Sequence, residues 1–367
     1  MIESRRLKNI SASRPLEDDL RRMILRNELQ EGSAITPEME LAKRYNISRN
    51  TARKALANLE NEGLLRKVQG RGTFVVPPDE RPAGSPLKHK IILAVNDYSD
   101  MLTSNAYDRN LISGCLEYAF HANMELLVAD PSSFSYESLS NDFDSGRLNG
   151  IIWERPIKEI FPLIEELRDK KLPQVAISRS IPGVPSLFFD ADRSIRETVE
   201  FLNDIGHHDI AFVDLKSDYS IFVNRQRAFA DALRRMGHKY PEKYICLPPF
   251  GSKYEDELDK LPPVTAIISA SFVMDGIYSW LERKGLRVPG DISLISLSSE
   301  NSRELLSYPE LSAILDPRQE IGLTAMEILD DIIAGRQVSS APIRIRGELL
   351  IRKSCVSPLI NKEKVAI

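Results

Sequence analysis

The sequence predicts an α/β protein in two parts, a small winged helix-turn-helix at the N-terminus and a larger two-lobed α/β domain. Three observations lead to this fold class. The chain has 367 residues, which is too long for one ordinary domain. Residues 15–76 contain three helical patterns followed by two short β-prone runs. From Lys90 onward, apolar strands alternate with amphipathic helices, as in parallel sheets covered on both faces.

The N-terminal unit is predicted to fold in the order helix, helix, turn, helix, hairpin. Residues 15–28 carry apolar side chains at helical spacing. Pro37 opens a second helix, because proline is tolerated in a first turn. Ser48 is a suitable N-cap for a third helix over residues 49–62. Two β-prone runs around Gly70-Arg71-Gly72 then predict a hairpin, which completes the winged helix plan.

A linker and a two-lobed body follow. Residues 77–88 hold four prolines and one glycine, which predicts a semi-stiff, exposed linker. Strands of the body are predicted at 91–96, 125–129, 150–153, 174–177, 210–213, 266–269, 292–296 and 343–351, with helices at 105–123 and 193–205 among others. About 270 residues is long for one sheet, so two lobes are expected. Lobe 1 is placed at about 89–187 with 317–336, and lobe 2 at 188–316 with 337–357. The tail after Pro358 is predicted to be disordered.

Charge is unevenly distributed along the chain. Residues 1–76 carry 15 Lys and Arg against 10 Asp and Glu, whereas the remaining residues carry 34 against 43. A basic unit can displace counterions from nucleic-acid phosphates, and an acidic one cannot. No apolar run reaches the roughly 18 residues that cross a bilayer, and the first residues lack a secretory signal pattern. A cytoplasmic protein without membrane attachment is therefore expected.

Residues that would indicate catalysis or a metal are few. Cys115, Cys246 and Cys355 are odd in number and far apart, which argues against a disulfide framework or a zinc ribbon. The sequence has no Gly-x-Ser-x-Gly elbow, no phosphate loop and no metal-spaced His/Cys cluster. An enzyme is therefore not predicted, nor a cofactor or metal. Met274 and Trp280 lie on a predicted helix and are interpreted as core residues.

Two parts of the chain resemble known families. The segment ITPEMELAKRYNISRNTARKALANLENEGLLRKVQGRGTFV, residues 35–75, resembles the winged helix of the GntR family over its whole length. The body resembles the effector domain of LacI/GalR regulators, itself similar to periplasmic sugar-binding proteins. This second resemblance rests on LNDIGHHDIAFV (202–213), RQRAF (225–229) and GLRVPGDISLIS (285–296). Together the two cover nearly all of residues 15–355, in an arrangement similar to that of bacterial arabinose repressors.

The first resemblance implies that the third helix reads DNA in the major groove. Arg49 and Arg53 are four positions apart and so share one helix face. Because arginine can hold guanine bidentately and asparagine suits adenine, Arg53 and Asn50 are expected at base edges, and Arg49 at a base or phosphate. Met39 stands where this family usually carries an arginine, so that contact is expected to be missing. The other candidates for this interface are Arg44, Thr51 and Lys54 on the helices and Gln69, Gly70 and Arg71 on the wing.

The second resemblance implies an effector site at the carboxyl ends of the strands. Arg225, first in the Arg-x-x-Gly/Ala-Phe pattern, would donate hydrogen bonds to hydroxyls or a carboxylate. Three acidic positions of the family are Ser178, Phe272 and Ser298 here, which favours an acidic or phosphorylated sugar over a neutral one. The other candidates are Arg179, Asp190 and Ser271, with Tyr107, Phe272 and Trp153 considered for an aromatic wall.

The expected protein is a ligand-responsive, sequence-specific transcription regulator, a repressor of carbohydrate-utilisation genes by analogy with both families. Its expected partners are palindromic operator DNA, a sugar or sugar derivative, and a second copy of the chain. One alternative stays open, a regulator whose body only dimerises and binds no small molecule. The linker lacks the helical hinge of LacI proteins, so coupling must pass through linker geometry or through direct contact between head and body.

Overall fold

The computed structural model describes residues 13–77, 80, 89–95, 106–216, 220–249, 253–299, 305 and 309–358. The chain forms two compact units, and the winged helix shares the first with part of the body. Unit 1 comprises Met1–Asn96, Gly114–Val175 and Leu323–Ser339; unit 2 comprises Asp97–Ser113, Ala176–Gly322 and Ser340–Ile367. Most of the predicted linker and the tail after Pro358 lie outside the described residues.

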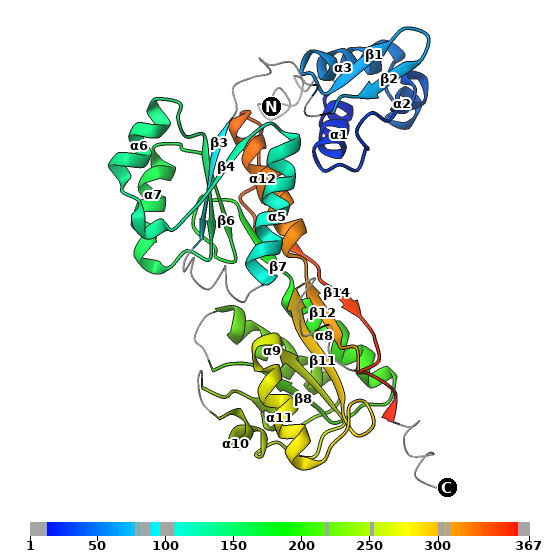
Figure 1. The fold of residues 1–367 in the computed structure, drawn as a ribbon, viewed down its shortest axis with the longest axis vertical. Helices are drawn as coiled ribbons and strands as arrows, with labels where there is room; N and C mark the ends of the chain where they lie inside the picture. Colours follow the sequence, from blue (N-terminus) through cyan, green and yellow to red (C-terminus); the bar gives the residue numbers. More distant parts are fainter. Residues whose placement is uncertain are drawn as a thin grey trace, which may run out of the picture. The chain divides into compact units, whose positions relative to one another are not determined.

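The winged helix has the predicted order of elements (Figure 1). Its helices are α1 (Arg14–Leu25), α2 (Glu38–Arg44) and α3 (Arg49–Asn61), and its wing is β1 (Leu65–Val68) with β2 (Gly72–Val75). The two wing strands pair antiparallel. Apolar residues at helical spacing on α1 face the buried side of α3. The core of this part is formed by Leu16, Leu20, Ile24, Leu41, Ala52, Ala55 and Leu59.

The first sheet of the body has the order β13-β7-β6-β5-β3-β4. These strands are Ile343–Ile345, Ser186–Phe189, Gln174–Ile177, Gly150–Glu154, Lys90–Val95 and Glu125–Ala129. Helices α5 (Ala106–His121) and α12 (Arg318–Ile333) flank it on one side, and α6 (Tyr136–Asp144) and α7 (Phe161–Asp169) on the other (Figure 1). Every residue of β5 is buried, as expected for a central strand covered on both faces.

The second sheet has the order β14-β12-β11-β10-β8-β9. These strands are Glu348–Leu350, Ser312–Asp316, Ser293–Ser299, Ala266–Ala270, Ile210–Val213 and Ile245–Cys246. Its helices are α8 (Ala191–Asp204), α9 (Ser220–Arg235), α10 (Tyr254–Leu258) and α11 (Met274–Lys284). Short 3-10 turns lie between elements of the first sheet at η3 (Pro131–Ser133) and η4 (Lys158–Ile160), and between elements of the second at η5 (Pro241–Tyr244) and η6 (Ser271–Val273). The central strands are parallel, and β14 pairs antiparallel with β12 at the edge.

The prediction of a single strand over residues 343–351 is wrong. That segment forms two strands in different sheets, because β13 pairs with β7 while β14 pairs with β12. Gly347 lies between them, where a Cβ atom would stand 2.5 Å from the carbonyl oxygen of Leu315 and 2.7 Å from the ring of Phe189. Only glycine fits such a close approach of backbone to backbone. The pattern of alternating apolar residues is continuous across the break and did not show it.

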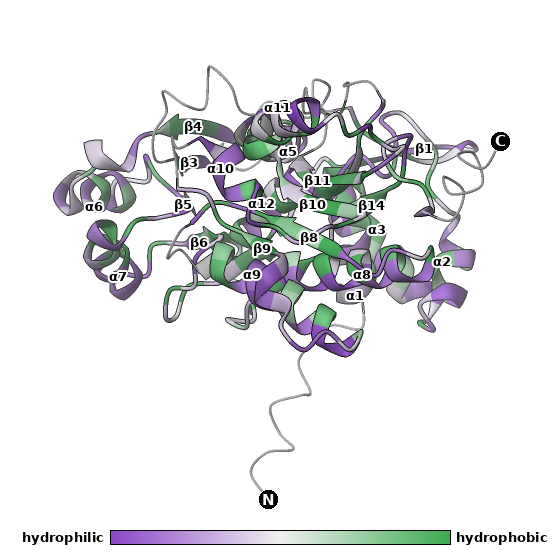
Figure 2. Ribbon diagram, turned by 90° about the horizontal axis from the view of Figure 1, so that it is seen from below, coloured by the Kyte–Doolittle hydropathy of each residue, from purple (hydrophilic) through white to green (hydrophobic). Residues whose placement is uncertain are grey.

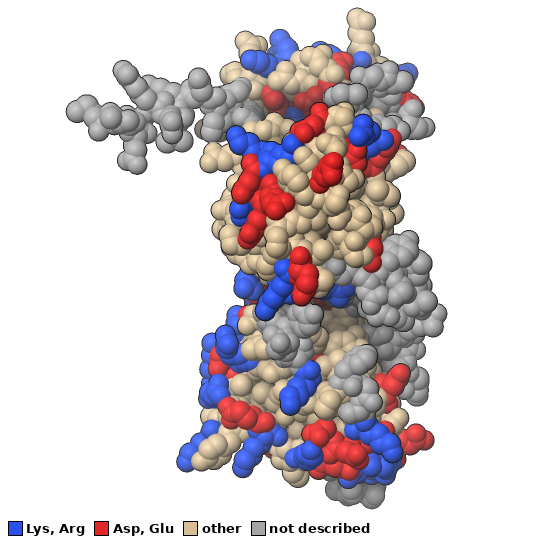
Figure 3. All heavy atoms as spheres, turned by 90° about the vertical axis from the view of Figure 1, so that its left-hand side faces the viewer, with Lys and Arg blue, Asp and Glu red and all other residues tan. Residues whose placement is uncertain are grey.

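Burial follows the predicted pattern elsewhere. Met274 and Trp280 belong to the core of the second sheet, which confirms their interpretation as core residues. In Figure 2, hydrophobic colour predominates on strands such as β8 and β11, and hydrophilic colour on helices such as α2 and α6. On the face of the body drawn in Figure 3, acidic and basic side chains are interspersed.

Among the described residues, no helix is both long and apolar enough to cross a membrane.

Candidate nucleic-acid interface and effector site

The first turn of α3 is fixed by a capping interaction. Ser48 Oγ accepts a hydrogen bond of 3.0 Å from the backbone N–H of Thr51 and lies 2.7 Å from Thr51 Oγ1. The cap orients the turn so that Arg49, Asn50 and Arg53 are all exposed. Thr51 is half-buried and its hydroxyl is engaged by the cap. The exposed face of the helix therefore carries two guanidinium groups and an amide.

Glu38, which the sequence did not indicate as a functional residue, holds both arginines of this face. Its Oε1 atom accepts hydrogen bonds from Arg49 Nε and, at 3.0 Å, from Arg53 Nη2, while Oε2 accepts from Arg53 Nε at 3.2 Å. The bonds from Arg53 and then Arg49 lower the pKa of Glu38 from 4.5 to about 2, against the opposing effect of partial burial. One carboxylate in α2 thus sets the direction of two side chains in α3.

The wing presents its candidates at a tight turn. Gly70 and Gly72 have φ angles of 76° and 114°, which glycine adopts without strain. Gln69, Gly70 and Arg71 are all exposed at this turn. On the helices, Arg44 and Lys54 are exposed as well, and Met39 has 65% of its surface exposed. The predicted interface is therefore open to solvent on α2, α3 and the wing.

Arg225 of α9 is buried beside the end of β8. Its Nη1 atom lies 3.9 Å from Oδ2 of Asp214, the residue that follows this strand. Asp214 is fully buried, and its other oxygen accepts a hydrogen bond of 2.9 Å from the N–H of Leu215. Burial raises the pKa of Asp214 from 3.8 to about 6, although the charge of Arg225 and the bond from Leu215 act in the opposite direction. The sequence did not indicate Asp214 as a site residue, because a lone acidic residue after a strand carries no motif.

Aromatic rings lie beside this arginine. The guanidinium carbon of Arg225 is 5.8 Å from the ring centroid of Phe222, and the rings of Phe222 and Phe272 are 6.1 Å apart. Phe272 is 48% exposed, so part of this residue is accessible to a ligand. Ser298 is buried at the end of β11, with its hydroxyl 2.7 Å from that of Ser296. The end of the second sheet thus brings together an arginine, a carboxylate, hydroxyls and aromatic rings.

The remaining candidates occupy varied positions. Asp190 caps α8 by accepting a long hydrogen bond, 3.4 Å, from the N–H of Arg193. Ser178 and Arg179, both half-buried, follow β6, and Ser178 has a positive φ of 61°. Ser271 begins the 3-10 turn η6 and is half-buried. Trp153 is buried and donates its indole N–H to Gln174 at 2.8 Å, so it belongs to the core of the first sheet. The side chain of Tyr107 lies outside the described residues.

Two families of known proteins match separate parts of the chain. Residues 12–75 match bacterial regulatory proteins of the gntR family, and residues 199–355 match periplasmic binding protein-like domains. These matches confirm the predicted winged helix and the predicted type of body. They also confirm the expectation of a regulatory protein rather than an enzyme.

Individual proteins extend this result. The transcriptional repressor CytR of Escherichia coli K12 is 33% identical over 199 residues, which cover 52% of this chain and 58% of the repressor. The arabinose metabolism transcriptional repressor of Geobacillus stearothermophilus is 25% identical over 359 residues, 92% of this chain and 96% of the repressor. The structure of the transcriptional regulator CelR with cellobiose aligns with a TM-score of 0.61 at 20% identity, over 84% of this chain and 90% of that one. This last likeness shows the fold alone. The similarity to the arabinose repressor confirms the predicted combination of parts.

Proposed function

Because the chain joins a gntR-family winged helix to a periplasmic-binding-protein-like body, we propose that it is a ligand-responsive transcription regulator that represses genes by binding specific DNA sites. The observation that carries this proposal is the exposed face of α3, on which Glu38 aligns Arg49 and Arg53. Two aligned guanidinium groups beside Asn50 form a set of donors suited to the acceptor edge of the major groove.

The roles proposed for individual residues in DNA binding rest on the exposure of their side chains. Arg53 and Asn50 are proposed to contact base edges, and Arg49 a base or a phosphate. Arg44 and Lys54 would contact phosphates, which fix the position of the protein but carry no sequence information. The wing turn would approach the minor groove through Gly70 and Arg71. Gln69, which is also exposed at the wing turn, would contribute beside them.

The body is proposed to bind a sugar or a sugar derivative at Arg225. Among the described residues, neither Asp214 Oδ2 nor Arg225 Nε has a hydrogen-bond partner in the protein, although both atoms are buried. Buried polar groups are nearly always hydrogen-bonded, so a ligand hydroxyl that reaches both would satisfy them. Asp214 also offsets the charge of Arg225, which weakens the argument for an acidic sugar drawn from the sequence. The ring of Phe272 would pack on an apolar sugar face.

A homodimer on a palindromic operator is proposed as the working form. Leu116 and Phe120, four positions apart on α5, are 50% and 61% exposed. Leu127, on β4 at the edge of the first sheet, is 59% exposed. Exposed apolar side chains gathered on one part of a domain often mark an association surface.

The proposed function is tested by selecting duplexes from a random DNA pool with the purified full chain. Enrichment of an inverted repeat is expected, and selected duplexes should bind at least a thousandfold more tightly than random DNA, on the order of the ratio known for specific binders. Failure to enrich any sequence would refute DNA-reading by α3. The parallel test of the body is thermal unfolding with neutral sugars, sugar acids and sugar phosphates. Stabilisation by one class names the effector chemistry, whereas no stabilisation favours a body that only dimerises.

A further inference from the structure

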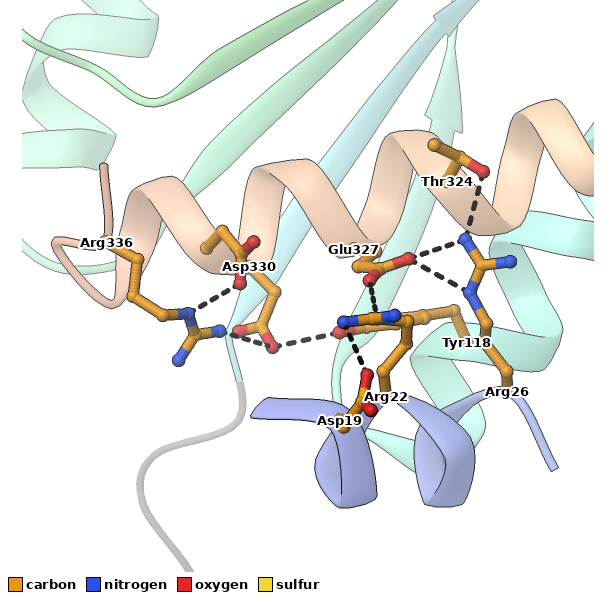
Figure 4. Close-up of polar contacts among 9 residues, drawn as sticks. Asp19, Arg22, Arg26, Tyr118, Thr324, Glu327, Asp330 and Arg336 are labelled. Atoms are coloured by element: carbon orange, nitrogen blue, oxygen red, sulfur yellow. Dashed lines mark hydrogen bonds and ion pairs between the residues drawn. The ribbon is translucent and has the colours of Figure 1, made fainter. Parts of the chain in front are cut away.

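The first helix of the winged helix presents basic side chains to the body. Arg22 and Arg26 are four positions apart at the end of α1, so they project from the same helix face. Both contact Glu327, which lies on α12 about 300 positions later in the chain. Figure 4 shows the carboxylate of Glu327 between the two guanidinium groups. One acidic side chain of the body is thus shared by two basic side chains of the head.

The geometry of this contact is that of charge-assisted hydrogen bonds. Arg26 donates from Nε to Glu327 Oε2 at 2.9 Å and from Nη2 to Thr324 Oγ1 at 3.0 Å. Arg22 Nε lies 3.0 Å from Glu327 Oε1. Arg26 and Glu327 are only 13% and 19% exposed, which distinguishes the pair from an ordinary surface ion pair. Because Glu327 uses both oxygens, the contact fixes orientation as well as distance.

A second contact and an internal brace support the docking surface. Glu31, in the turn after α1, has its Oε1 atom 3.5 Å from Nδ1 of His121 at the end of α5. Helix α5 is joined to α12 by the hydroxyl of Tyr118, which donates to Asp330 Oδ2 at 3.0 Å. Arg336 lies 3.6 Å from the same carboxylate (Figure 4). The surface that receives α1 is therefore built from two helices fixed to each other.

Other polar side chains of α1 contact the DNA-reading helices. Arg21 donates to both carboxylate oxygens of Glu62, at 3.0 Å and 2.6 Å, at the end of α3. One oxygen of Asp19 lies 3.1 Å from Arg22 Nη2, and the other accepts a hydrogen bond from the hydroxyl of Tyr45. Tyr45 ends α2, just before the turn into α3. Polar contacts therefore connect α12 to the end of α2 through Arg22 and Asp19. A separate contact through Arg21 connects α1 to the end of α3.

We propose that α1 is a docking element, which holds the winged helix on α12 through Arg22, Arg26 and Glu327. The body, and not the linker alone, then sets the direction in which α3 faces DNA. Of the two routes of coupling that the sequence left open, this is direct contact between head and body. Its consequence for regulation rests on the proposed function, since a change in the body can alter DNA binding only if it moves or frees the head.

The docking is tested by the tumbling of the head in the full chain, without DNA or ligand. The three native cysteines are buried, so a fluorophore can be attached at Asn61→Cys, an exposed position at the end of α3. Time-resolved anisotropy of the label should show slow tumbling with the whole chain. In Glu327→Arg, where like charges face each other, a fast component from the freed head should appear. Glu282→Arg, a charge reversal at an exposed position on α11, is the matched control and should tumble like the parent.

Reversing the charges on both sides of the contact tests whether the two arginines of α1 and Glu327 are the groups that form it. Arg22→Glu with Arg26→Glu, combined with Glu327→Arg, should remove the fast component. A fast component in the parent protein, a slow Glu327→Arg variant, or no restoration would each overturn the proposal. If Glu327→Arg fails to fold, Glu327→Gln removes only the charge and is expected to give a smaller fast component, and its absence would count against the proposal in the same way.

A second readout uses DNA. With the selected inverted repeat, a docked pair of heads should bind only near one half-site spacing, because the body fixes their separation. Glu327→Arg should tolerate insertions of a few base pairs between the half-sites. Equal spacing tolerance in both proteins would overturn the claim that the body sets head orientation. A chain that binds no duplex would refute the proposed function instead, and the anisotropy result would still decide the docking.

Discussion

Arg225 and Asp214 are both buried, and Arg225 Nη1 lies 3.9 Å from Asp214 Oδ2. The two charges are close enough to attract each other but too far apart to form a hydrogen bond. One comes from helix α9 and the other from the end of strand β8. The pair combines five N–H donors with carboxylate acceptors, which is the inventory needed to hold vicinal hydroxyls. A separation of this size leaves each group able to take a further hydrogen bond from a ligand.

Asp214 predicts a dependence of stability on pH. Its folded-state pKa of about 6 is above the ordinary 3.8, so its contribution to stability is complete below pH 3.8 and is lost as the pH rises through about 6. The side chain at this position cannot ionise in Asp214→Asn. The free energy of unfolding of the variant should therefore rise relative to that of the parent as the pH is raised from about 4 to about 7.5, by at most roughly 3 kcal/mol. Urea unfolding at both pH values, followed by tryptophan fluorescence, measures this gain. A difference that is the same at both values would contradict the raised pKa.

Arg225→Ala should abolish the thermal stabilisation by whichever sugar stabilises the parent protein, because the main donor to the ligand is removed. Affinity for the selected operator without sugar should be unchanged, since Arg225 lies in the body. Arg227→Ala, an exposed position two residues later on α9, is the matched control. Unchanged sugar affinity in Arg225→Ala would remove this residue from the effector site.

Glu38→Gln should lower the ratio of specific to non-specific DNA affinity. The substitution weakens the bonds that align Arg49 and Arg53, while it also removes a negative charge that repels phosphates. Specific affinity should therefore fall, and affinity for random duplex should hold or rise. Gel-shift titrations on both DNAs at one salt concentration give the ratio. An equal change on both DNAs would show that Glu38 acts only through charge.

Arg53→Ala should weaken binding to the selected site by about 1–3 kcal/mol and relax discrimination at one base pair in each half-site. Lys54→Ala, the next residue on α3, should weaken binding to all sequences alike and reduce the salt dependence, as expected for a phosphate contact. Titration against single-base variants of the site distinguishes the two behaviours. Equal loss on every sequence for Arg53→Ala would make it a phosphate contact as well.

Phe120→Glu should shift the chain from dimer toward monomer, because it places a charge on the exposed apolar part of α5. Sedimentation velocity over a range of protein concentrations measures the shift. Tyr240→Glu, at another aromatic residue that is 55% exposed, should leave the association unchanged. A parent protein that sediments as a monomer throughout would contradict the proposed dimer itself.

The sequence by itself determined most of the elements and their order. Helical spacing and caps gave α1 and α3 within a few residues, and apolar runs gave most of the parallel strands. These signals are local, because they depend on residues a few positions apart and on the period of each element. For the same reason the arginines on the exposed face of α3 could be assigned from their spacing.

Only the tertiary structure decided which side chains meet across the chain. Glu38 reaches Arg53 across a turn, Asp214 meets Arg225 at the end of a sheet, and Arg26 meets Glu327 after 301 positions. The split of residues 343–351 between two sheets was settled in the same way, by the partners that β7 and β12 offer. Such pairs carry no periodic signal, because they depend on how distant elements pack and not on the pattern within any one of them.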